Sequence, residues 1–69
     1  MDLFDLEGRP YITLDNLLKI EGWCESGGVA KNVIASGAVY VNGEVETRKR
    51  CKIFSGQIVQ LGELKVKVT

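Results

Sequence analysis

The sequence of 69 residues contains no histidine, two cysteines and a single proline. The absence of histidine removes the commonest general base and metal ligand of proteins. Cys24 and Cys51 are far apart and form no C-x-x-C pair, so the ligands of a zinc site are lacking and no metal is expected. We interpret both cysteines as reduced thiols. Two cysteines leave a disulfide open, but nothing in the sequence requires one.

Long apolar runs are also missing, and none approaches the roughly 20 residues that span a bilayer. The acidic start, MDLFDLEG, lacks the basic segment of a secretory signal. We therefore expect one cytoplasmic domain, residues 1–69, which is monomeric and has no membrane partner.

The sequence shows no motif of a catalytic site. It has no G-x-G-x-x-G, no phosphate-binding loop of the G-x-x-x-x-G-K-[ST] type and no nucleophile elbow. Paired carboxylates can act as acid and base, but Glu44 and Glu46 flank a hairpin and are interpreted as solubilising edge charges. We predict no catalytic residues, no cofactor and no enzyme activity.

Charge is unevenly distributed along a chain whose formal net charge is zero. Residues 1–25 carry six acidic and two basic side chains, a local charge of −4. Residues 26–69 carry seven basic and three acidic ones, a local charge of +4. Such asymmetry indicates a polyanionic partner, but an ordinary solvated surface would give the same counts. Charge alone leaves both interpretations open.

Two short amphipathic helices are predicted, at residues 14–21 and 27–36. Thr13 is expected to cap the first, and Ser26 the second, because each hydroxyl can accept a hydrogen bond from a first-turn amide. Gly37 is expected to end the second helix in the left-handed conformation. Trp23, in the link, is expected to cover the helix ends, and an exposed stacking surface is the secondary alternative. The apolar stripes are Leu14, Leu17 and Leu18, and then Val29, Ala30, Val33 and Ile34.

Strands are predicted at residues 2–6, 38–41, 57–61 and 64–68, with the first and last strands paired. Alternation along the last strand places Leu64, Val66 and Val68 on the core side. The predicted fold class is α+β, with a helical hairpin packed on a small, mostly antiparallel sheet.

Asn42-Gly43 predicts a reverse turn between two strands. A two-residue loop would place Val39 on the same face as Glu46. A three-residue loop over 41–43, with Gly43 at positive φ, would pair Val39 with Val45 and keep that face apolar. We favour the three-residue loop for this reason.

A basic run follows the hairpin, with four cations between residues 48 and 52. If residues 47–53 are extended, alternation places Arg48, Arg50 and Lys52 together on the outer face, next to Lys31. Cys51 and Ile53 would then face inward, and Lys49 would point toward the sheet edge and reach solvent only along its stem.

Several motifs, taken in this order and spacing, resemble the S-four RNA-binding domain, named for the fourth protein of the small ribosomal subunit. They are most similar to its small stand-alone bacterial branch, whose members carry S-G-G-x-A-K and V-N-G-E-x-E-T-R-K-R. The resemblance covers about residues 12–59. The matching positions are Leu17, Leu18, Lys19, Gly22, Ser26, Gly27, Gly28, Ala30, Lys31, Ile34, Gly37, Val39, Val41, Asn42, Gly43, Arg48, Lys49, Arg50, Lys52 and Gly56.

The resemblance implies the αL motif, a helical hairpin plus sheet, and binding to structured RNA of a ribosomal or transfer-RNA kind. Gly27 and Gly28 stand where many relatives have an arginine pair, so the bare amides of a helix start would bind phosphate there. The residues expected to contact RNA are Lys19, Ser26, Gly27, Gly28, Lys31, Asn32, Arg48, Lys49, Arg50 and Lys52.

Two other functions remain open at this point. The same basic face would suit an adaptor that binds an acidic protein. DNA binding by the helical hairpin is the weaker alternative, because the second helix offers only Lys31 and Asn32 to reach base edges.

Overall fold

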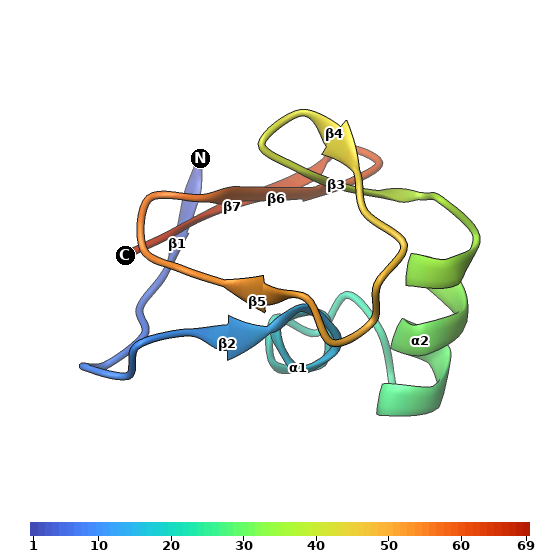
Figure 1. The fold of residues 1–69 in the computed structure, drawn as a ribbon, viewed down its shortest axis with the longest axis horizontal. Coiled ribbons are helices and arrows are strands. Elements are labelled where there is room, and N and C mark those ends of the chain that lie inside the picture. Colours follow the sequence, from blue (N-terminus) through green and yellow to red (C-terminus); the bar gives the residue numbers. More distant parts are fainter.

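The chain folds as two helices on a five-stranded sheet, with a separate two-stranded ribbon (Figure 1). The computed structural model describes all residues, 1–69. Neither helix has the length and apolar character needed to cross a membrane. The elements are β1 (Asp2–Phe4), β2 (Ile12–Thr13), α1 (Leu14–Ile20), α2 (Gly27–Ala35), β3 (Val39–Val41), β4 (Glu44–Val45), β5 (Lys52–Ile53), β6 (Ile58–Leu61) and β7 (Leu64–Val68).

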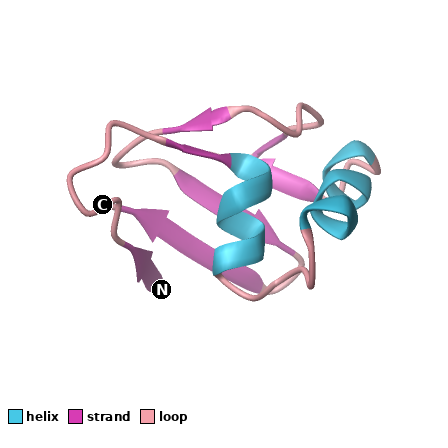
Figure 2. Cartoon of the chain, turned by 90° about the horizontal axis from the view of Figure 1, so that it is seen from below, coloured by secondary structure: helices cyan, strands magenta, loops and turns pink.

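The sheet has the order β1-β7-β6-β3-β4. All neighbours are antiparallel except β1 and β7, which run parallel, so the predicted pairing of the first and last strands is confirmed. The β2–β5 ribbon is antiparallel, with Ile12 opposite Ile53 and Thr13 opposite Lys52. Figure 2 shows α1 lying across one face of the sheet and α2 at its side. This arrangement confirms the predicted α+β fold class.

The core lies between the helices, the sheet and the ribbon. Leu14, Leu17 and Leu18 are fully buried, which confirms the apolar stripe predicted for the first helix. In α2, Ala30 and Ile34 are also fully buried. The strands contribute five more fully buried side chains, those of Val39, Ile53, Val59, Val66 and Val68.

Leu64 and Val29 were predicted to face the core but lie outside it. Leu64 is 47% exposed and Val29 is 42% exposed. Leu64 is the first residue of β7, and Val29 lies in the first turn of α2. Trp23 is half-buried and packs against the core, as expected for a residue that covers the helix ends.

The two helices begin in different ways. Ser26 caps α2 as predicted, because its Oγ accepts a hydrogen bond from the Val29 N–H at 3.2 Å. Thr13 occupies the cap position of α1, but its side chain makes no capping hydrogen bond, so the predicted mechanism is wrong there. Gly37 follows α2 at φ +85°, which confirms the left-handed end of that helix.

The β3–β4 hairpin has a two-residue loop, so the predicted three-residue loop is wrong. Tyr40 pairs with Val45 and Val41 with Glu44. Asn42 and Gly43 have φ values of +52° and +84°, as a two-residue primed turn requires. The positive φ predicted for Gly43 is confirmed, although it belongs to a turn of a different type.

The hairpin keeps no continuous apolar face, because β4 is a two-residue edge strand with little core beneath it. Val45 points outward and is 52% exposed, whereas Val39 is buried beside β6. Asn42 fixes the loop to β6, because its N–H donates to the Ile58 carbonyl and its Oδ1 accepts from the Ile58 N–H. Long-range bonds of this kind outweigh the pattern along one strand.

Candidate nucleic-acid interface

Residues 48–52, here named the basic turn, do not form the predicted extended segment. The Cys51 N–H donates to the Arg48 carbonyl at 3.1 Å and closes a turn over the two residues between. Only the last residue of the run, Lys52, belongs to a strand, together with the buried Ile53. The prediction that three alternate cations line one extended face is therefore wrong.

The backbone of the basic turn is attached to the start of α1. The Leu14 N–H donates to the Cys51 carbonyl at 2.9 Å, and the Asp15 N–H donates to the Lys49 carbonyl at 3.0 Å. First-turn amides have no partner within their own helix, so these carbonyls replace the cap that Thr13 does not supply. The same bonds hold the basic turn in a fixed position.

Arg48 is tied to the glutamate at the end of the hairpin. Its Nε and Nη2 each lie 3.0 Å from a carboxylate oxygen of Glu46, and its N–H donates to the same carboxylate at 2.8 Å. The hydrogen bonds from Arg48 lower the pKa of Glu46 to about 2, and Glu46 raises the pKa of Arg48. The positive charge of Arg48 is thus partly neutralised.

Cys51 lies beside this ion pair and is half-buried. Burial raises the pKa of its thiol, and the nearby Glu46 carboxylate raises it further. Burial also raises the pKa of the Cys24 thiol. The structure has no disulfide between the two thiols.

The other cations of the basic turn have no acidic partner. Arg48–Glu46 is the only ion pair in the structure, so Lys49, Arg50 and Lys52 form none. All three of these side chains are exposed. A hollow of about 470 Å³ lies among the side chains of Arg48, Arg50, Cys51 and Lys52. A concave surface with this charge attracts anions.

The start of α2 is the second part of the predicted site. The Ser26 hydroxyl accepts only the Val29 N–H and leaves the Gly27 and Gly28 amides free of it. A Cβ at Gly27 would meet no other atom within 4 Å, so this end of the helix is open to solvent.

Three predicted contacts lie on the helices. Asn32 is exposed and Lys31 half-buried on α2, and Lys19 is exposed in the last turn of α1. No hydrogen bond or ion pair joins them to the basic turn. Both views nevertheless place the loop that carries the basic turn on the side of the molecule where α2 lies (Figure 1, Figure 2).

Two exposed aromatic residues beside the basic turn were not predicted as contacts from the sequence. The ring centroids of Tyr11 and Phe54 are 5.9 Å apart, and the Lys52 Nζ lies 4.9 Å from the centroid of Tyr11. Each aromatic residue stands next to an inward isoleucine, Ile12 or Ile53, and this alternation was the only signal.

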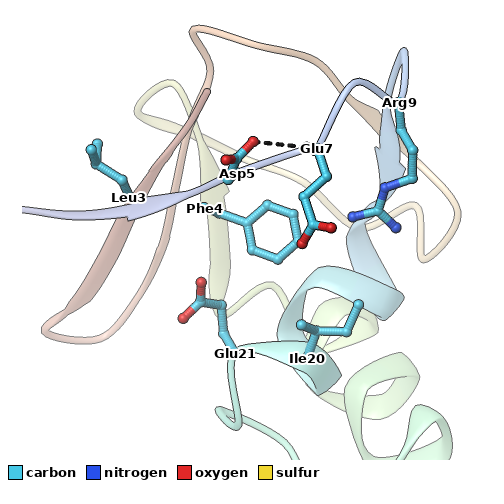
Figure 3. A pocket seen from close by; sticks show the side chains of 7 residues that line it. All are labelled: Leu3, Phe4, Asp5, Glu7, Arg9, Ile20 and Glu21. Atoms are coloured by element: carbon cyan, nitrogen blue, oxygen red, sulfur yellow. Dashed lines mark hydrogen bonds between the residues drawn. The ribbon is translucent and has the colours of Figure 1, made fainter.

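The largest hollow, about 590 Å³, carries the opposite charge (Figure 3). The Asp5 carboxylate accepts the Glu7 N–H at 2.7 Å, and Arg9 Nε donates to the Leu6 carbonyl at 2.8 Å. In both overall views, β1 and the segment after it lie across the molecule from the basic turn (Figure 1, Figure 2). The lining residues are Leu3, Phe4, Asp5, Glu7, Arg9, Ile20 and Glu21.

Comparison with known proteins finds relatives over nearly the whole chain. The sequence model of the S4 domain matches residues 4–69. The chain is 53% identical over 68 residues to the Escherichia coli (strain K12) protein named "Putative RNA-binding protein YbcJ", covering 99% of this chain and 97% of that protein. It is 36% identical over 50 residues to the Bacillus subtilis (strain 168) protein named "Probable ribosome maturation protein RlbA", covering 72% of this chain and 70% of that one.

A solved structure has the same fold. The solution structure of YbcJ from Escherichia coli, described as revealing an αL motif involved in RNA-binding, gives a TM-score of 0.76 at 52% identity. The match covers 100% of this chain and 87% of that chain. The predicted αL motif is therefore confirmed.

Proposed function

The chain belongs to the S4 domain family, and from this premise we propose that it is a non-catalytic protein that binds structured RNA through the basic turn. One observation carries the proposal. Lys49, Arg50 and Lys52 are unpaired cations on a turn whose backbone is fixed to the start of α1. The similarity to YbcJ, whose αL motif is described as involved in RNA-binding, supports it.

The cations of the basic turn differ in the role we assign to them. Lys49, Arg50 and Lys52 are the primary phosphate contacts, because no carboxylate competes for them. Arg48 contributes less, because Glu46 occupies two of its donors. The remaining contacts, which extend the surface along the helices, are Lys19, Ser26, Gly27, Gly28, Lys31 and Asn32.

The chemistry of this surface suits recognition of backbone and shape. Lysine and arginine side chains and helix-start amides bind phosphate oxygens, which position a nucleic acid without reading its sequence. An A-form helix or junction presents its phosphates differently from B-form DNA, and structured RNA is recognised mainly by such features. We therefore expect RNA to be bound more tightly than duplex DNA of equal length.

Replacing Lys49 and Arg50 by glutamine tests the proposal. The probe is a stem-loop RNA with a single-stranded extension, titrated at several salt concentrations. Binding should weaken in the double variant, and the slope of log K against log salt should fall by roughly 0.7 to 0.9 for each phosphate that the variant no longer neutralises. Stability should change by less than about 0.5 kcal/mol, because the bonds to α1 use backbone carbonyls that the substitutions retain.

A matched control removes two other lysines. Lys65 and Lys67 are exposed on β7, so Lys65→Gln/Lys67→Gln changes the net charge equally at another place. Equal decreases in affinity in the two double variants would contradict a site at the basic turn. Duplex DNA binding as tightly as RNA would contradict the preference for RNA. Displacement of RNA by an equal charge of poly-glutamate would instead favour an adaptor for an acidic protein.

A further inference from the structure

Packing against the core does not explain why Tyr11 and Phe54, here named the aromatic pair, are exposed. Tyr11 is 36% exposed and Phe54 is 46% exposed, although each ring adjoins a strand next to the core. The rings contact each other at an interplanar angle of 52°, which is a tilted arrangement of adjacent rings. Two large apolar rings in contact at the surface form a stacking area open to a ligand.

The register of the ribbon explains why both rings point outward. Ile12 lies opposite Ile53, and both are buried. Alternation then turns the residues before Ile12 and after Ile53, which are Tyr11 and Phe54, to the opposite face. The same face carries Lys52, one pair further along the ribbon.

Lys52 connects the aromatic pair to the basic turn. Its Nζ lies over the ring of Tyr11, and its side chain also lines the hollow of the basic turn. A second hollow of about 470 Å³ has Arg48, Lys52 and Phe54 among its lining residues, together with the carboxylates of Glu44 and Glu46. Because Lys52 belongs to the basic turn and lies over Tyr11, a nucleotide whose phosphate contacts Lys52 would have its base close to the aromatic pair.

We propose that Tyr11 and Phe54 form a stacking site for one unpaired base of the RNA held by the basic turn. The inference rests on the proposed function and adds a contact that phosphate binding does not supply. Aromatic side chains beside a basic groove stack on successive bases because every base has a π-face. Stacking on the rings tolerates any base for the same reason.

Lys52 controls access to the site. In the free protein its ammonium interacts with the face of Tyr11, an attraction that is modest at an exposed position. A phosphate competes for the same ammonium through a charge-assisted hydrogen bond, which is stronger. A phosphate that draws Lys52 away would leave this face of Tyr11 free for the base.

The experiment separates base stacking from phosphate binding. One probe is a stem-loop RNA with a single-stranded adenosine extension, and the second is the same stem-loop with an abasic extension of equal length and charge. The wild-type protein should bind the adenosine form more tightly, by about 5- to 150-fold for one stacked base. Phe54→Leu should abolish this preference and leave binding of the abasic form unchanged.

Tyr40→Leu is the matched control, because Tyr40 is also an exposed aromatic residue but lies on β3. This variant should retain the preference for adenosine, and melting curves should show all variants folded. Equal binding of the two RNAs by the wild type, or a preference that persists in Phe54→Leu, would overturn the stacking site and leave phosphate binding intact. If neither RNA binds, both the proposed function and this inference are overturned.

Discussion

At the scale of single residues, Glu46 decides how the basic turn is charged. The sequence suggested a solubilising carboxylate on a hairpin edge, but the side chain is only 15% exposed and accepts three hydrogen bonds from Arg48. Arg48 is only two residues from Glu46 in the sequence, but the turn at 48–51 directs its guanidinium back to the Glu46 carboxylate. Glu46 therefore helps to hold the basic turn, and it partly neutralises one of the four cations of that turn.

The first prediction concerns stability at acidic pH. The pKa of Glu46 falls from the ordinary 4.5 to about 2 in the folded chain, because Arg48 donates hydrogen bonds to the charged form. The ionised pair stabilises the fold above pH 4.5, and this contribution is lost as the pH falls from 4.5 towards 2. Glu46→Gln should show a smaller loss of melting temperature across this window, measured by thermal melts. Glu44→Gln, an exposed neighbour without a partner, should keep the wild-type slope; the same slope in both variants would contradict the prediction.

The second prediction concerns Gly43. Its φ of +84° lies in the left-handed region, and a Cβ there would meet no atom within 4 Å. Gly43→Ala should therefore cost about 1 kcal/mol of unfolding free energy through backbone conformation alone. Gly27→Ala is the control, since Gly27 begins α2 without a positive φ and has similar open space. It should be neutral or stabilising, by up to about 1 kcal/mol. Equal effects on the denaturation midpoint would argue against the positive φ of Gly43.

At the scale of elements, the features that depend on nearby residues were predicted better from the sequence than those that depend on long-range contacts. The stripe of Leu14, Leu17 and Leu18, the Ser26 cap and the glycine end of α2 depend on neighbours within four residues, and all are confirmed. The start of α1 depends on carbonyls at residues 49 and 51, which are distant in sequence. No pattern near Thr13 indicates that its capping role is already filled.

The candidate site shows the same division. Its cations could be found from the sequence, because the run from Arg48 to Lys52 is dense in charge. Their arrangement could not, because the turn is defined by its bonds to α1 and by the Glu46 pair. Tyr11 and Phe54 come together only through the β2–β5 pairing, which joins segments from opposite halves of the chain.

The third prediction compares the starts of the two helices. Ser26→Ala should cost about 1 kcal/mol, because the Ser26 Oγ accepts the Val29 N–H. Thr13→Ala should cost less than about 0.5 kcal/mol, because its side chain caps nothing. Urea denaturation of both variants measures the difference. A larger loss for Thr13→Ala would mean that the carbonyls of residues 49 and 51 do not replace a side-chain cap.

At the scale of the whole molecule, the zero net charge conceals two surfaces of opposite sign. The extents are 29 × 21 × 18 Å, so opposite sides lie well beyond the Debye length of about 8 Å at physiological salt. The carboxylates of Asp5, Glu7 and Glu21 gather around one hollow, and the unpaired cations of the basic turn lie on the other side. A bound polyanion is therefore attracted to one side and repelled by the other, which favours a single orientation.

The last prediction tests whether RNA responds to this local surface or to net charge. Glu7→Gln/Glu21→Gln raises the net charge by two, as much as Lys49→Gln/Arg50→Gln lowers it. Counterion release depends on the phosphates that the protein contacts, so the glutamate pair should leave the slope of log K against log salt unchanged. Its effect on affinity at about 0.15 M salt should stay below about threefold, because charges beyond a Debye length are screened. The lysine–arginine pair should flatten the slope in the same titrations. Slopes that shift by equal amounts in opposite directions would show that binding follows the total charge of the chain, and the basic turn would then lose its special role.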